Sequence, residues 1–354
     1  MSAAPLRSLA VTAASAITAA GADVDQTCSS IRAGVTRLRE HAYYACTPHD
    51  PEWEEGDPLV VAAVDDIDPL LDGPARLVAL LKPALADLFR RAGLKRRDLA
   101  EHALLVALPA PDDAVASWGL GDAFVEGLCR ELGLSFAATR SSRAGHAGVF
   151  ELLREAGALL AAGGARSCIV AGVDSYLSED RMQRLDGAWR LKSARNVDGF
   201  CPGEAAAALL VEAEKPARAR GAPIQAVVSA LGLAAEPETV SSDRQSTGRG
   251  LTEALRGAMH PDRGPAWVLC DLNGESYRAF EWGVALARLG ERLSGVRKLV
   301  YPALSLGDVG AATGAVLVAA AAAGFRRGYA PAGEAVLWAA SDGPLRAAAR
   351  VGRP

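Results

Sequence analysis

The 354-residue chain has few aromatic residues, no excess charge of one sign and no paired cysteine motif. Its 38 basic and 42 acidic side chains give a formal net charge of −4, so it lacks the positive field that electrostatic binding to nucleic acid requires. Aromatic residues make up only 5%, and the 36 glycines indicate helices that pack closely on a sheet. Half of the residues are hydrophobic, which is enough for a large core and too much for a disordered chain.

The cysteine and histidine positions indicate neither a disulfide framework nor a metal site. The six cysteines form no C-x-x-C pair, and we interpret them as small core residues of a protein in a reducing compartment. They are Cys28, Cys46, Cys129, Cys168, Cys201 and Cys270. Four of the five histidines have no spacing typical of metal ligands, namely His41, His49, His102 and His260. A G-x-x-x-x-G-K phosphate loop is also missing, so we expect neither a metal ion nor a cofactor.

Two apolar stretches imitate export or membrane signals. Residues 8–22 follow Arg7 and resemble the apolar core of a signal peptide, but we interpret residues 9–17 as a first β-strand. The uncharged run 309–325 consists mainly of Ala and Gly and is short for a membrane span, so we interpret it as a buried core helix. We therefore expect a cytoplasmic protein without membrane contacts.

Short apolar runs alternate with longer amphipathic ones, which predicts an α/β fold. Residues 75–93 place six apolar side chains on one helical stripe that ends at Gly93. The run 59–64 is a candidate strand, and residues 102–111 form another strand that ends at its prolines. Residues 176–197 have the composition of a loop.

The second part of the chain repeats the pattern of the first. Residues 145–175 and 307–342 each read Gly-polar-x-Gly, then a helix, then a strand that ends in Asp, with His146 and Asp308 as the equivalent polar residues. The most linker-like segment, KPARARGAP, begins at Lys215. The repeat predicts an internal duplication into halves 1–215 and 216–354.

The chain with these features resembles the β-ketoacyl synthases of the thiolase superfamily. Residues 169–221 are similar to a ketosynthase segment in which a strand ends in Gly-Val-Asp and an Asp-Gly-Phe-x-x-Gly-Glu turn leads into the next strand. Residues 9–34 are similar to the family's opening strand and helix, and residues 305–328 to its late Gly-His-x-x-x-Ala-x-Gly helix. The resemblance covers essentially the whole chain. It implies a thiolase-like αβαβα five-layer α/β fold built from two pseudo-repeated halves.

The resemblance fails at the family's Cys-His-His triad. It places His146 where condensing enzymes carry the nucleophilic cysteine, and Asn273 and Asp308 where they carry the two histidines. Ala303 replaces the usual lysine. Without a thiol to hold the acyl chain as a thioester, we do not expect Claisen condensation from this chain alone.

Two further acidic residues are candidates for a supporting role. Glu204 matches a family glutamate that supports the floor of the active site, and a structural role suits it better than a chemical one. Glu275 follows Asn273 in the segment NGESYRAFEW, residues 273–282, which is polar and aromatic where the family has a small loop.

Two functions remain open from the sequence. One is a non-condensing binding or scaffold subunit, analogous to chain-length factors, that forms a homodimer or a heterodimer with a related ketosynthase and contacts acyl-carrier protein or acyl-CoA. The other is an acyltransferase or thioesterase-like hydrolase, with His146 as nucleophile or as a base kept neutral by the helix dipole. His146 and Asp308 could also merely cap two buried helices. An open pocket favours the enzyme, and one filled by side chains of residues 273–282 favours the subunit.

Overall fold

Ten strands are hydrogen-bonded side by side in the computed structural model, which describes residues 7–48, 52 and 55–354. Their order is β10-β9-β11-β12-β8-β1-β7-β6-β4-β5. One half of the sheet contains β1 (Leu9–Thr18), β4 (His102–Ala107), β5 (Ala138–Ser142), β6 (Ser167–Ser175) and β7 (Glu204–Ala213). The other half contains β8 (Ala226–Ala235), β9 (Trp267–Cys270), β10 (Lys298–Val300), β11 (Glu334–Ala340) and β12 (Leu345–Gly352).

The two halves share one topology. When the five strands of each half are numbered in chain order, their order from the outer edge of the sheet to its middle is 3-2-4-5-1 in both halves. The outer strands pair in parallel, while β7 and β12 are antiparallel to both of their neighbours. The halves meet where residues 9–11 of β1 pair with residues 226–228 of β8. The predicted boundary between residues 215 and 216 falls within α6 (Glu214–Ala219) and stays a prediction.

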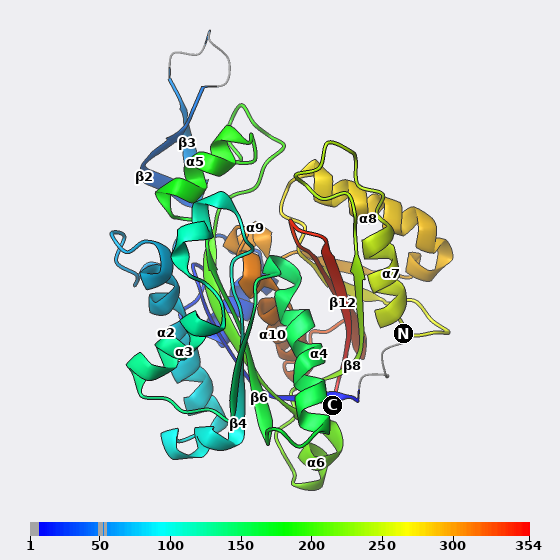
Figure 1. The fold of residues 1–354 in the computed structure, drawn as a ribbon. Helices are drawn as coiled ribbons and strands as arrows, with labels where there is room; N and C mark the ends of the chain where they lie inside the picture. The colour runs from blue at the N-terminus through cyan, green and yellow to red at the C-terminus, as the bar shows by residue number, and fades with distance from the viewer. Residues whose placement is uncertain (1–6, 49–51, 53–54) are drawn as a thin grey trace.

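Helices form three layers around the two half-sheets (Figure 1). The outer layers are α2 (Gly73–Ala92) with α3 (Asp122–Leu132), and α7 (Arg249–Ala258) with α8 (Ser276–Leu289). The central layer contains α4 (Gly148–Ala161) and α10 (Thr313–Arg326). Three clusters of buried hydrophobic residues fill the spaces between the layers. The expected five-layer αβαβα arrangement is confirmed.

The uncharged run 309–325 forms most of α10, and every residue from Thr313 to Phe325 is buried. Small side chains are required here because α10 lies close to α4. A Cβ atom on Gly314 would lie 2.7 Å from the Cβ atom of Val149. The prediction of a core helix is therefore confirmed. In the part of the chain that the structure describes, no helix is long and apolar enough to cross a membrane.

Several local predictions are also confirmed. All ten residues of β1 are buried, which makes the predicted strand over residues 9–17 part of the core. Helix α2 ends at Gly93, whose φ of 67° lets its N–H reach the carbonyl of Arg90. The first helix is α1 (Val24–Ala33), and the Asp23 side chain accepts a hydrogen bond from a backbone amide in its first turn.

The expectation of a loop over residues 176–197 is wrong in part. The segment contains α5 (Glu179–Gly187), which packs on a two-stranded sheet of β2 (Arg39–Cys46) and β3 (Asp57–Val61). The Ser178 hydroxyl caps α5, and only Met182 and Leu185 join the buried apolar cluster. Two apolar residues give no clear helical period in a charged segment, so the helix depends on its cap and on tertiary packing.

Candidate functional site

The candidate site lies where the N-terminal ends of α4 and α10 meet. His146 is in the short turn Gly145–Ala147 before α4, and Asp308 lies two residues before the corresponding turn Gly310–Ala312 that leads into α10, so Ala311 and not Asp308 is the structural counterpart of His146. Gly145 and Gly307 precede these residues with φ angles of 66° and 65°, a conformation that glycine adopts without strain. The Nε2 atom of His146 lies 2.7 Å from Oδ1 of Asp308, and both side chains are 3% exposed. The internal repeat thus brings its two polar residues into direct contact.

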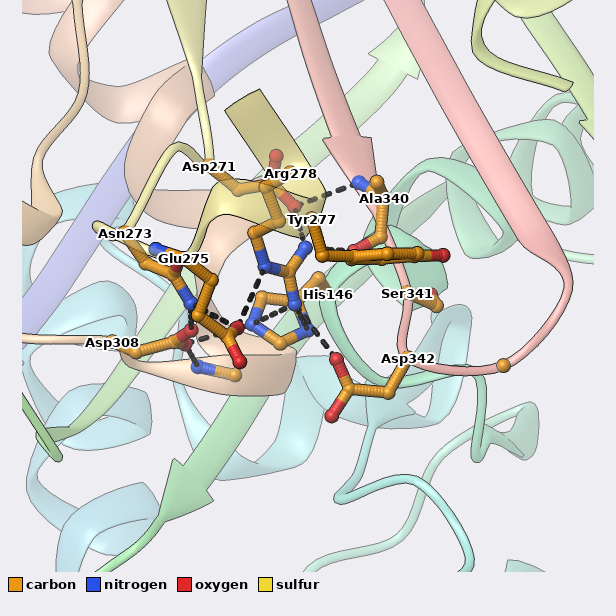
Figure 2. A network of polar contacts seen from close by, with 12 residues as sticks. His146, Asp271, Asn273, Glu275, Tyr277, Arg278, Asp308, Ala340, Ser341 and Asp342 are labelled. Carbon is orange, nitrogen blue, oxygen red and sulfur yellow. Dashed lines mark hydrogen bonds and ion pairs between the residues drawn. The ribbon is translucent and has the colours of Figure 1, made fainter. Parts of the chain in front are cut away.

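Asn273 joins the same cluster from the loop that follows β9 (Figure 2). Its side-chain amide donates to Oδ2 of Asp308 at 2.7 Å and to Oε2 of Glu275 at 2.9 Å. The Asp308 carboxylate therefore bridges His146 and Asn273. The structure brings together the three residues that the resemblance places at the triad positions.

Arg278 from α8 lies at the centre of this cluster and was not predicted from the sequence (Figure 2). It is 1% exposed, and Nη1 donates to Oδ2 of Asp271 at 2.9 Å and to the carbonyl of Ala340. Its Nη2 atom donates to Oδ1 of Asp342 at 2.9 Å and lies 3.4 Å from each ring nitrogen of His146. The two ring nitrogens point in different directions in the plane of the imidazole. Because Nη2 is equally far from both, the guanidinium lies over the ring and not in line with either nitrogen.

Glu275 takes part in a second, connected set of ion pairs. Arg190, which follows α5, donates from Nε and Nη2 to the Glu275 carboxylate at 2.6 and 3.0 Å. The same guanidinium donates to Asp342 at 2.9 and 3.2 Å. Glu275 also lies 3.6 Å from Nε of Arg278. These contacts join the two halves of the chain through charges that are buried or partly buried.

Glu204 lies in a different place. Its fully buried carboxylate pairs with Arg76 of α2 at 2.6 and 2.8 Å. It also accepts from the Ser175 hydroxyl at 2.8 Å and from the Val64 amide at 2.9 Å. These partners fasten α2 to the start of β7, and the structure does not bring Glu204 into contact with His146.

The charges in the cluster favour a protonated imidazole. Burial by itself lowers the pKa of His146, but the Asp308 carboxylate outweighs it and the pKa is raised. Burial likewise acts to raise the pKa of Asp308, yet His146 and Arg278 lower it well below its usual range. The structure contradicts the expectation of a neutral imidazole at this helix start, because a carboxylate in direct contact favours the imidazolium.

His146, Asn273 and Asp308 do not line a common pocket. His146 borders a cavity of about 360 Å³, whose lining includes neither Asn273 nor Asp308. On the other side of Asp308 the free space is about 10 Å³, roughly the room of one water molecule. Arg278 contacts His146 and Glu275 contacts Asn273, and both belong to residues 273–282.

Two site residues that were not predicted, Asp271 and Asp342, lie at positions that the sequence pattern indicates. Asp271 and Asp342 each follow the apolar strands β9 and β11 by one or two positions. These strands are parallel neighbours, so their carboxyl ends meet at one edge of the sheet, where the acids face Arg278. Arg190 gave no such signal, because its partners are distant in sequence.

The six cysteines, all in the described part of the chain, are unsuited to nucleophilic catalysis. Burial raises the pKa of every thiol, and it reaches about 12 for Cys28, Cys46 and Cys168. None lies at the start of α4. Among the described residues, no three His, Cys, Asp or Glu side chains are arranged to hold a metal ion.

No family model matches the chain, and no curated protein matches it either. Solved structures share its fold. A chain of AntDE:AntF, a type II PKS acyl-carrier protein in complex with its ketosynthase bound to the hexaketide, has a TM-score of 0.77 and 14% identity, over 99% of this chain and 100% of that chain. The ketosynthase from module 6 of the bacillaene synthase of Bacillus subtilis 168 has a TM-score of 0.76 and 13% identity, over 98% and 72%.

The ishigamide ketosynthase/chain length factor is similar in the same way, with a TM-score of 0.72 and 17% identity over 98% of this chain and 99% of that chain. At these identities the matches establish the fold alone. The chain has the mixed α/β fold of ketosynthase and thiolase-like structures.

Proposed function

We propose that this protein is a ketosynthase-like subunit that does not carry out condensation and acts by binding a partner. The observation that carries the proposal is the buried contact of Arg278 with His146 and its carboxylate neighbours. A condensing enzyme needs a thiolate and an accessible acyl pocket at this point. At the position that the resemblance assigns to the nucleophile, this chain has an imidazole covered by a guanidinium.

The geometry supports the subunit better than the acyltransferase or hydrolase. A general base needs a free lone pair, and the raised pKa of His146 favours the protonated ring, which has none. Nε2 lies 2.7 Å from Asp308, and the other ring nitrogen, Nδ1, has Nη2 of Arg278 at 3.4 Å. The nearby Ser341 hydroxyl is also occupied, because it donates to the carbonyl of Ala144 and accepts from the amide of Ala147. Neither side chain is poised to attack a thioester.

The partner we propose is a related ketosynthase, with acyl-carrier protein or acyl-CoA as a further contact. One neighbour in fold is named as a ketosynthase with a chain length factor, and another as a ketosynthase in complex with an acyl-carrier protein. In the present chain β5 lies at the edge of the sheet and pairs with β4 alone among the described strands. An exposed edge strand is a natural place for a second sheet to pair.

The test is heterodimer formation with a ketosynthase of the same organism, measured by size-exclusion chromatography with light scattering. The Ser141 amide donates to Asp122 rather than to β4, so Thr139, two residues earlier, also directs its N–H to the outer side. Thr139→Pro should abolish the dimer by removing that donor, while Thr139→Ala should retain it. A chain that stays monomeric with every ketosynthase and with itself would overturn the partner role.

A further inference from the structure

Helix α8 has an uncharged face that points away from the protein. The helix lies in the outer layer of the second half, and its inner side packs on the core through Trp282, Ala285 and Leu289 (Figure 1). Eight residues between Ser276 and Gly290 are exposed, and only Arg288 among them carries a charge. A surface helix normally presents charged and polar side chains to water. This face is therefore unusual, and no element in the described part of the chain covers it.

The seven uncharged residues, here called the outer face of α8, form three rows, because positions seven apart lie two turns apart on one side of a helix. The middle row has side chains that are small or absent. One flanking row has a large residue followed by a small one, and the other has the reverse order. The rows are Ser276, Gly283 and Gly290 in the middle, Phe280 and Ala287 on one side, and Ala279 and Leu286 on the other.

Two copies of this face fit each other when the helices are antiparallel and cross at Gly283. A two-fold axis at that point reverses the order along each row, so Phe280 of one copy meets Ala287 of the other, and Leu286 meets Ala279. Large side chains thus pack against small ones, and the glycines at the crossing let the backbones approach closely. A parallel pair would instead bring large residues to the same height as large ones.

Charges at the two ends of α8 favour the same arrangement. Asp198 is exposed beside the first turn, where its carboxylate accepts from the amide of Ser276 at 2.6 Å. Arg288 is exposed in the last turn and donates to the carbonyl of Thr247 at 2.7 Å. In an antiparallel pair the acidic end of one copy lies beside the basic end of the other, and the two helix dipoles are opposed.

We propose that the outer face of α8 binds a second copy of this chain in an antiparallel, two-fold contact. One helix face is smaller than a stable interface, which buries about 1,200–2,000 Å² in total, so the dimer is weak and reversible. The contact is separate from the partner strand β5, which lies at one end of the sheet, whereas α8 follows β9 near the other end. A chain that pairs through β5 keeps the outer face of α8 free.

Sedimentation velocity of the full chain between about 1 and about 200 µM tests the proposal. The average mass should rise with concentration from that of one chain towards that of two. Phe280→Glu should raise the dissociation constant about tenfold or more, because it buries an unpaired carboxylate in the contact. Gly283→Gln should also weaken the dimer, although its Cβ atom meets nothing within 4 Å in a single chain. Leu70→Glu, the control, places the same charge at a side chain that is 87% exposed outside α8, and should change nothing.

A mixing experiment tests the antiparallel register. Ala287→Lys alone should weaken the dimer, whereas its equimolar mixture with Phe280→Glu should associate more tightly than either variant alone. The new ammonium group and the new carboxylate meet only in the mixed antiparallel dimer.

The melting temperature of each variant shows whether it is folded, and Gly283→Gln replaces Phe280→Glu if the latter is not. Three outcomes would overturn the proposal: a mass that stays that of one chain at every concentration, an equal loss in Leu70→Glu, or a mixture that associates no more tightly than its components. A dimer that Thr139→Pro abolishes and Phe280→Glu retains would also overturn it, and would support the contact at β5 instead.

Discussion

The guanidinium of Arg278 covers the imidazole of His146, with Nη2 at 3.4 Å from both ring nitrogens. Two cationic groups can remain in contact in a buried site only if carboxylates surround them. Four do so here, and they are Asp271, Glu275, Asp308 and Asp342. His146, which the family resemblance places at the nucleophile position of condensing enzymes, is thus part of a buried ion-pair network.

Removal of Arg278 should destabilise the fold. Arg278→Met leaves the buried carboxylate of Asp271 without its arginine partner and removes one of the two arginines that hold Asp342, so the free energy of unfolding should fall by about 3–5 kcal/mol. Arg288→Met on the same helix, where the side chain is exposed, should change it by less than about 1 kcal/mol. Urea unfolding followed by circular dichroism measures both. Equal effects of the two substitutions would show that Arg278 holds no buried network.

The ion pair of His146 and Asp308 predicts a definite pH dependence. The pKa of His146 is raised in the folded chain, so its contribution is complete below the unfolded value of about 6.5 and is lost as pH rises through the folded value. The lowered pKa of Asp308 adds stability above about pH 4, where the unfolded carboxyl ionises.

The loss of unfolding free energy in His146→Gln should therefore be larger at about pH 5.5 than at about pH 9. Urea unfolding at both pH values measures it, with His260→Gln as the control because that ring lies near the surface. A loss that is equal at the two pH values, or larger at pH 9, would contradict the charged pair.

Two glycine substitutions of opposite sign test the packing of the central layer. Gly314→Ala places a Cβ atom 2.7 Å from Cβ of Val149, so overpacking should lower the free energy of unfolding by about 1–3 kcal/mol. Gly283→Ala in α8 meets open space and should raise it by about 0.5–1 kcal/mol through helix propensity. If Gly314→Ala were also stabilising, α4 and α10 could not pack as closely as described.

The thiols should resist alkylation in the folded chain. Burial raises the pKa of all six, so little thiolate exists at neutral pH. Iodoacetamide at about pH 7.5 should leave the native protein nearly unmodified within minutes and should label all six cysteines in urea. Rapid labelling of one cysteine in the native protein, seen by mass spectrometry, would identify a reactive thiol and weaken the proposal of a non-condensing subunit.

The sequence predicted the long elements of the fold because their periodicity and caps are local. Residues 9–17 and 75–93 carry their own signals, an apolar run and a stripe closed by Gly93. The meeting of His146 with Asp308 followed from the internal repeat and the family resemblance. The position of Arg278 over His146 did not, because it depends on how α8 packs against the ends of β9 and β11.

Helix α5 and the protonation state of His146 could not be predicted from the sequence for the same reason. The helix has only two residues in the buried cluster, so its sequence resembles a loop until tertiary contacts are known. The charge of His146 depends on a carboxylate from the other half of the chain, which outweighs the local effect of the helix start. Long-range contacts decided both cases.

The most direct measurement is incubation of the protein with acyl-CoA and acyl-carrier-protein thioesters, with intact-protein mass spectrometry and thiol release followed together. The buried network predicts no acyl adduct, and no thiol release beyond that of His146→Ala. An acyl adduct on the wild-type chain, or thiol release that disappears in His146→Ala, would contradict the non-condensing subunit and support an acyltransferase or hydrolase that uses His146.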